Sequence, residues 1–283
     1  MNSPFRNSML NIPALAAVLC FVTLGSSGPL FASHITLQIN VSPAVRENQL
    51  SCLVNITNQG DESASSVQVH LEFQGRRYSS AALPTLAVGQ NHSASFSLPT
   101  AGLPGGRHAL AIFVDYADLN GYPFTALSHG DFIIGDDNPP SIHGVIDPID
   151  LGSEETLVLR IKNLDSIPKE IKMKLFLPKE ISSPQPENQI SLNGSTEQSV
   201  RFRIRNFSAL EGSTYQVFVL AEYDEQGKHS CFFTPGTVKI VPARSFFSRN
   251  KWALGVAAGL LILLLIGIQI VAYRKGTGSV ISK

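Results

Sequence analysis

The stretch 53-LVNITNQGDESASSVQVHLEF-73 contains two runs in which apolar and polar residues alternate, separated by a polar, turn-like segment. Successive side chains of a β-strand point to opposite faces of its sheet, so each run predicts a half-buried strand. The same alternation recurs between residues 34 and 241, without a long stretch of helical periodicity. The apolar faces of the first two predicted strands comprise Leu50, Cys52, Val54 and Ile56, and Val67, Val69, Leu71 and Phe73.

The pattern returns about one domain length later in the chain. Segment 158-VLRIKNLDSIPKEIKMKLFLP-178 resembles 53–73, and two further segments repeat at nearly the same spacing. A spacing that drifts by only two residues over three segments predicts two tandem copies of one fold. Each copy has about 100 residues and several short strands, as an immunoglobulin-like sandwich does. The matching pairs are Asn58 and Asn163 (105 residues apart), Phe96 and Phe202 (106), and Tyr116 and Tyr223 (107).

Composition sets the boundaries of these copies. The segment 135-GDDNPP-140 has consecutive prolines, which cannot donate to a sheet ladder. We therefore expect sandwiches over 34–135 and 141–241, joined by a linker at 136–140.

Near the N-terminus, Arg6 precedes an apolar run and then small residues, which predicts a secretory signal peptide over 1–32. Cleavage after Ala32 and cleavage after Ser27 both fit.

A second apolar run lies near the C-terminus. Residues 252–273 are 22 consecutive uncharged residues, and as a helix they would extend about 33 Å, enough to cross a bilayer core. The predicted fold class is therefore all-β, with two tandem immunoglobulin-like β-sandwich domains followed by one C-terminal transmembrane α-helix. The signal peptide orients residues 34–251 outside and 274–283 as a cytoplasmic tail. Gly255 and Gly259 have the spacing of a helix-packing motif, although chance glycines are the alternative.

The order of five short motifs resembles a known group of domains. They are VNITNQG (54–60), SSVQVHLEF (65–73), LAVGQNHSASFSL (86–98), PGGRHALAIFVDY (104–116) and DLNGYPF (118–124). Together they are similar to the bacterial and archaeal extracellular β-sandwich modules of the CARDB and NEW3 type. The second copy is a looser match, with Leu164 and Asp165 where the first has Gln59 and Gly60. The resemblance implies a cell-surface or periplasmic module used as a spacer or adhesion unit.

The segment 115-DYADLNG-121 raises the question of a calcium site. Asp118, Asn120 and Gly121 fit part of the calcium-loop pattern D-x-[DN]-x-[DN]-G, but Tyr116 stands where that pattern needs its first acid. The counterpart 222-EYDEQG-227 keeps the tyrosine and the glycine but loses the asparagine. Both segments are therefore predicted to be hairpin turns, with calcium binding by Asp118 and Asn120 as the alternative.

Cationic residues alternate with apolar ones in 199-SVRFRIRNF-207. If the strand order is that of an immunoglobulin fold, this strand lies beside 156-TLVLRIKN-163, and their cations share the outer face. Such a face could bind an acidic envelope protein, an anionic glycan or lipid headgroups; the alternative is a solvated face balanced by nearby glutamates. The five cations are Arg160, Lys162, Arg201, Arg203 and Arg205.

Charge and motifs also exclude some functions. Residues 34–251 contain 22 acidic and 18 basic residues, which argues against nucleic acid as a partner. No H-E-x-x-H, C-x-x-C or G-x-S-x-G motif occurs, so neither an enzyme nor a cofactor is expected. The sequence predicts a membrane-anchored extracytoplasmic protein for adhesion or protein–protein interaction, with the lipid bilayer as one partner. The alternatives are an accessory subunit of a transport or secretion complex, or an accessory module of carbohydrate-active machinery.

Overall fold

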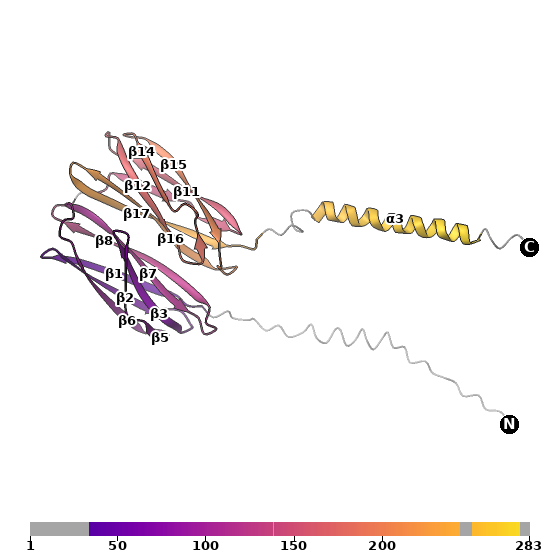
Figure 1. Ribbon diagram of the computed structural model, residues 1–283, viewed down its shortest axis with the longest axis horizontal. Helices are drawn as coiled ribbons and strands as arrows, with labels where there is room; N and C mark the ends of the chain where they lie inside the picture. Colours follow the sequence, from indigo (N-terminus) through magenta and orange to yellow (C-terminus); the bar gives the residue numbers. More distant parts are fainter. Residues whose placement is uncertain (1–33, 138, 244–250, 278–283) are drawn as a thin grey trace, which may run out of the picture.

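The structure is a computed structural model that describes residues 34–137, 139–243 and 251–277. Its body consists of two β-sandwiches, followed by a helix (Figure 1). The first sandwich contains β1 (Leu37–Arg46), β2 (Gln49–Asn58), β3 (Ala64–Phe73), β4 (Arg76–Ser79), β5 (Leu83–Leu86), β6 (Asn91–Pro99), β7 (Gly106–Ala117) and β8 (Pro123–Ile134). The second contains β9 (Ile142–Ile146), β10 (Ile149–Leu151), β11 (Glu154–Asn163), β12 (Lys169–Phe176), β13 (Ile181–Ser182), β14 (Glu187–Leu192), β15 (Glu197–Asn206), β16 (Thr214–Glu225) and β17 (Lys228–Ile240).

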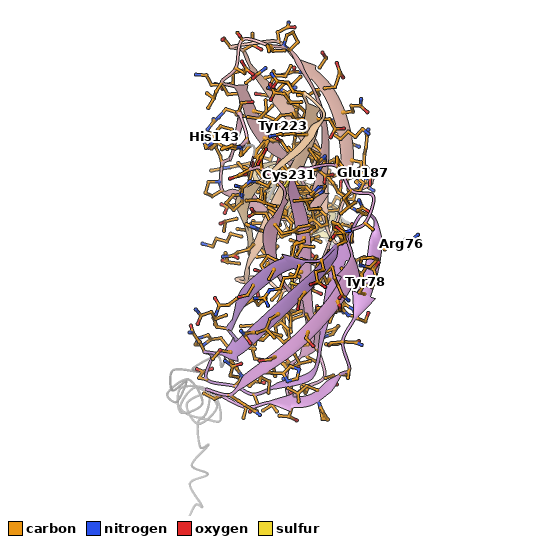
Figure 2. All side chains as sticks on the ribbon, turned by 90° about the vertical axis from the view of Figure 1, so that its left-hand side faces the viewer. Arg76, Tyr78, His143, Glu187, Tyr223 and Cys231 are labelled. Carbon is orange, nitrogen blue, oxygen red and sulfur yellow. The ribbon has the colours of Figure 1, made fainter. Side chains whose placement is uncertain are left out.

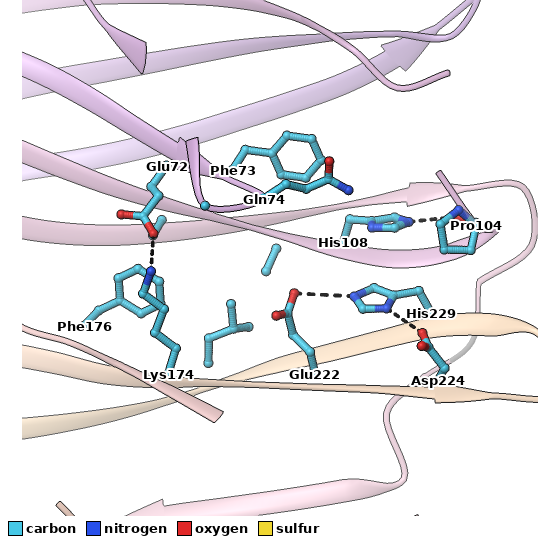
Figure 3. A pocket seen from close by; sticks show the side chains of 14 residues that line it. Glu72, Phe73, Gln74, Pro104, His108, Lys174, Phe176, Glu222, Asp224 and His229 are labelled. Atoms are coloured by element: carbon cyan, nitrogen blue, oxygen red, sulfur yellow. Dashed lines mark hydrogen bonds and ion pairs between the residues drawn. The ribbon is translucent and has the colours of Figure 1, made fainter. Parts of the chain in front are cut away.

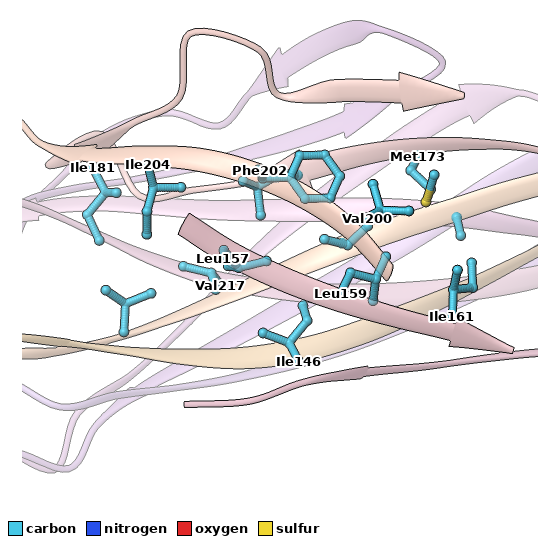
Figure 4. Packing of buried hydrophobic residues seen from close by; sticks show 14 of the residues in the cluster. Ile146, Leu157, Leu159, Ile161, Met173, Ile181, Val200, Phe202, Ile204 and Val217 are labelled. Carbon is cyan, nitrogen blue, oxygen red and sulfur yellow. The ribbon is translucent and has the colours of Figure 1, made fainter. Parts of the chain in front are cut away.

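One large sheet runs through both sandwiches. Its order is β14-β12-β16-β17-β7-β3-β4, with β5, β8 and β10 paired at the side. The first sandwich packs the sheet β1-β2-β6 against its half of this large sheet, and the second packs the sheet β13-β15-β11-β9. The alternating apolar residues meet between the layers, where Figure 4 shows Phe202, Leu157 and Val217 among the buried side chains. The predicted all-β class is therefore confirmed for this part of the chain.

Short hairpins connect several neighbouring strands. Residues with positive φ form the two-residue turns Glu47–Asn48, Gln74–Gly75 and Gln226–Gly227. A turn with positive φ at both positions has the twist that antiparallel strands need, and glycine and asparagine adopt that conformation at the lowest cost. These local choices fix the register of β1 with β2, β3 with β4 and β16 with β17.

Asn58 and Asn163, the first matching pair, have the same structural role. Both side chains are fully buried. In each, the amide nitrogen donates to the carbonyl oxygen four residues ahead, and the amide oxygen accepts from the backbone N–H two residues ahead. The asparagine thus holds the loop that follows its strand, which explains why this residue occurs in both copies.

The two sandwiches are inverted relative to each other. β7 and β17 run parallel where they meet, and β16 runs antiparallel to β17. β7 and its counterpart β16, which carry the matching Tyr116 and Tyr223, therefore run in opposite directions. As a result, the start of the first sandwich in the sequence, at His34, and the end of the second, at Ile240, lie at the same end of the molecule (Figure 1).

Helix α3 (Lys251–Thr277) projects away from the sandwiches (Figure 1). Within the described residues, no helix is long and apolar enough to cross a membrane. The predicted transmembrane helix over 252–273 is therefore not confirmed. Apart from the adjacent residues and the helix's own backbone, no described atom lies within 4 Å of where a Cβ of Gly255 or Gly259 would be. Helix pairing at these glycines stays a prediction. The predicted signal peptide and residues 278–283 of the predicted tail lie outside the described residues.

Candidate functional site

A shared hydrophobic cluster joins the two sandwiches. The central residues of β7 and β16 are apolar at successive positions, so both faces of each strand are buried. One face packs into its own sandwich, and the other faces the opposite sandwich. The sandwiches therefore form one body, which Figure 2 shows from the side. The shared cluster consists of Ala109, Ala111, Phe113, Leu127, Phe176, Phe218, Leu220 and Cys231, with Phe233 packed against it.

Polar contacts surround this cluster. Lys179 pairs with Asp115 across the interface at 3.0 Å, and Lys174 pairs with Glu72 at 2.5 Å. The Tyr122 hydroxyl donates to the backbone carbonyl of Ser208. The ion pairs are partly exposed and contribute modestly, so the apolar cluster supplies most of the attraction between the sandwiches.

A cavity of about 360 Å³ opens at one side of the interface (Figure 3). His108 and His229 stack there with their ring centres 4.7 Å apart. Glu222 and then Asp224 raise the pKa of His229, whereas burial lowers the pKa of His108. The carboxylates thus favour the protonated form of His229, and burial favours the neutral form of His108. Within the described part of the chain, no group of three His, Cys, Asp or Glu side chains is placed to hold a metal.

A larger cavity, of about 610 Å³, lies at the other side of the interface. Near it, Glu180 is fully buried and accepts a 2.8 Å hydrogen bond from the Thr125 N–H, while its second carboxylate oxygen has no partner in the described residues. Burial is the main reason that the pKa of Glu180 is raised. Burial and the charge of Glu180 also raise the pKa of Tyr215 to about 12. Because the unpartnered oxygen is shielded from solvent, we assign Glu180 to the interface and not to ligand binding in the cavity.

Glu180 predicts a pH dependence of stability. Its pKa is higher in the folded than in the unfolded protein, so the stability it contributes is present at low pH and is lost as the pH rises through the folded pKa. Glu180→Gln retains the acceptor for the Thr125 N–H and removes the charge. We expect this variant to be more stable than the parent protein at neutral pH and equally stable at about pH 4. Denaturant unfolding at both pH values tests this, and an equal difference at both would contradict it.

The five cations proposed for an anionic partner lie together on one exposed face. β11 and β15 are antiparallel neighbours, with Arg203 opposite Thr156 and Arg201 opposite Val158. The apolar residues of both strands point into the core, so their polar residues share the outer face. We call this set the cation row; it comprises Arg160, Lys162, Arg201, Arg203 and Arg205.

Acidic side chains pair with part of the cation row. Glu154 bonds to Arg205 at 2.7 Å and lies 3.3 Å from Arg203. Asp147 pairs with Arg160 at 2.9 Å. Lys162 and Arg201 make no ion pair within the residues that the structure describes. Acidic side chains therefore balance the charge of three of the five cations and leave the other two without an ion pair among the described residues.

Residues 34–119 match the CARDB family. The matched range covers β1 to β7 of the first sandwich, and the strand β8 that completes it follows the match. Residues 34–119 form a CARDB domain. No curated protein matches the chain.

Solved structures with weak overall similarity include two large proteins. A mutant of Salmonella alpha-2-macroglobulin has 11% identity and a TM-score of 0.30, over 74% of this chain and 16% of that one. Red sea bream transglutaminase has 13% identity and a TM-score of 0.28, over 76% and 32%. A protein of unknown function from Porphyromonas gingivalis has 12% identity and a TM-score of 0.31, over 72% and 99%. The chain thus spans a minor part of the first two proteins.

In the CARDB domain, the segment proposed for calcium forms a turn. The Asp118 side chain accepts hydrogen bonds from the backbone N–H groups of Asn120 and Tyr122, at 2.9 and 2.8 Å. Gly121 has φ 78°, a conformation that favours glycine. Asp118 therefore stabilises the turn with its own carboxylate, and Asn120 adds one more contact to that carboxylate at 3.5 Å. This geometry gives calcium binding no support.

The outer face of the CARDB domain differs from its counterpart in the second sandwich. Among the outward positions of β1, β2 and β6, the only charged residue is Arg46, at a strand end. The others are mostly serine, asparagine, glutamine and threonine. The fold therefore does not require charge on this face.

Proposed function

We propose that this protein is a non-enzymatic binding protein that presents two rigidly joined sandwiches at the outer side of a cell envelope, for adhesion or protein–protein interaction. The observation that carries the proposal is the cation row, an exposed set of cations on one sheet face with two members free of ion pairs among the described residues. Because the shared cluster fixes the sandwiches, little ordering accompanies binding at this face. The CARDB domain supports an extracytoplasmic module.

We further propose that residues 252–273 hold the protein at a lipid bilayer. Support comes from the uncharged sequence and from its exposed side chains: Leu260 to Leu265 are each exposed by 53–66%. An apolar surface of this extent needs an apolar environment. The chain enters the first sandwich and leaves the second at the same end of the molecule. That end would face the bilayer, and the other end of the sandwiches would point away from it.

Cell fractionation tests this location. We expect the full chain to stay with membranes after an alkaline wash and to react with an impermeant amine-labelling reagent added outside intact cells. Leu261→Lys with Leu264→Lys should release the protein into the wash, because each lysine costs about 3 kcal/mol in the bilayer core. Leu53→Lys with Leu119→Lys, at exposed positions of the CARDB domain, is the matched control and should remain bound. Recovery of the unmodified chain in the soluble fraction would reject the location.

A further inference from the structure

We propose that the cation row binds a linear polyanion, an acidic polysaccharide whose carboxylate or sulfate groups repeat along its chain. This inference rests on the proposed function and names the partner of the same face. It begins from the register of β11 and β15, which determines how the five charges are spaced.

Each of five successive residue pairs on the outer face contributes one cation. Along the two strands, the pairs are Glu154–Arg205, Thr156–Arg203, Val158–Arg201, Arg160–Ser199 and Lys162–Glu197. Residues on one face of a strand repeat about every 6.7 Å, so the five cations extend over roughly 27 Å. The first three cations lie on β15 and the last two on the neighbouring strand β11, so the row is elongated and steps sideways once. An elongated row of cations at a regular spacing matches a linear chain of repeating anions better than it matches a single phosphate or carboxylate.

Acids lie near both ends of the row and beside Arg160, which pairs with Asp147, whereas the central Arg201 is uncovered. Glu154 lies in the first pair and Glu197 in the last. Arg201, in the middle, faces the uncharged Val158 and makes no ion pair within the described residues. The ion pairs of Arg203 and Arg205 with Glu154 are solvent-exposed, with arginine side chains 62% and 50% exposed, so an incoming anion can replace them at little cost.

The CARDB domain supplies an internal comparison. Its equivalent sheet face has the same period and similar length, yet it carries serine and asparagine where the second sandwich carries cations. The positive charge therefore follows from something other than the needs of the sandwich fold. Charge complementarity with a partner accounts for it.

The test measures binding of the full chain, in mild detergent, to polygalacturonate and to its neutral methyl ester. We expect binding to the acidic polymer only, weakening as salt is raised. Arg201→Gln with Arg203→Gln and Arg205→Gln should reduce the affinity by about tenfold, since three exposed charge contacts are lost. The control variant Arg46→Gln with Arg76→Gln and Lys172→Gln removes three exposed charges elsewhere and should stay within about twofold.

Two further probes distinguish this inference from the proposed function. If linear polyglutamate binds as tightly as the polysaccharide or more tightly, the partner is an acidic protein and the inference is wrong. If envelope material binds through the arginines but neither polygalacturonate nor a sulfated polysaccharide binds, the inference fails and the proposed function stands. If the triple variant binds envelope material and every probe as the parent protein does, both fail. Circular dichroism of each variant verifies that it is folded.

Discussion

Replacing Phe218 with alanine is expected to lower the free energy of unfolding by about 3–5 kcal/mol. Phe218 is only 3% exposed, and its ring stacks on Phe176 with centres 5.0 Å apart. Phe233 meets it edge-on at 5.3 Å. Because these rings belong to the cluster between the sandwiches, the cavity left by alanine weakens the contact between the sandwiches as well as the second sandwich itself.

Denaturant unfolding of the full chain and small-angle X-ray scattering measure this effect. The matched control is Phe202→Ala, which removes an equally buried ring from the core of the second sandwich alone. Both variants should lose comparable stability, but Phe218→Ala should also increase the radius of gyration. If Phe218→Ala leaves the dimensions unchanged and loses less than about 1 kcal/mol, the shared cluster does not hold the sandwiches together.

Much of the fold follows from local sequence pattern. Alternation identified the buried face of β2, where Leu50, Cys52, Val54 and Ile56 are fully buried. The repeat spacing identified Asn58 and Asn163 as equivalent, and both have equivalent hydrogen bonds. The buried face of β2 follows from the alternation of apolar and polar residues, and the equivalence of the two asparagines follows from the repeat spacing. Both patterns can be seen in the sequence without knowledge of distant contacts.

The interface between the sandwiches could not be predicted in the same way. The continuous apolar run 109–114 does signal a strand buried on both faces. Even with that signal recognised, the run does not say which surface covers the second face. The inverted arrangement depends on contacts between residues more than 100 positions apart, such as Lys174 with Glu72.

The candidate site was predicted in part. Alternation placed Arg201, Arg203 and Arg205 on one face, and the expected strand order placed Arg160 and Lys162 beside them. The one-cation-per-pair arrangement came only from the register of β11 with β15. A register shifted by two residues would keep all five cations on the same face but change which pairs carry them.

Replacing Asn163 with alanine should have the second large effect, a loss of about 2–4 kcal/mol. The Asn163 amide donates to the carbonyl oxygens of Ile167 at 2.8 Å, Asn193 at 3.2 Å and Leu192 at 3.3 Å, and accepts from the Asp165 N–H at 3.0 Å. The side chain is fully buried, so alanine removes four hydrogen bonds from a largely shielded site, of which the bond to the Leu192 carbonyl is buried and the other three are partly buried.

Asn58→Ala provides the decisive comparison, because Asn58 has the equivalent bonds in the CARDB domain. If the two asparagines are one structural device used twice, both variants should lose similar stability, and exposed Asn40→Ala should change it by less than about 0.5 kcal/mol. Thermal and denaturant unfolding of the three variants measures these differences. If Asn163→Ala greatly lowers the free energy of unfolding and Asn58→Ala does not, the buried asparagine stabilises only the loop of the second sandwich. The two copies would then share a fold but not the interactions that stabilise it.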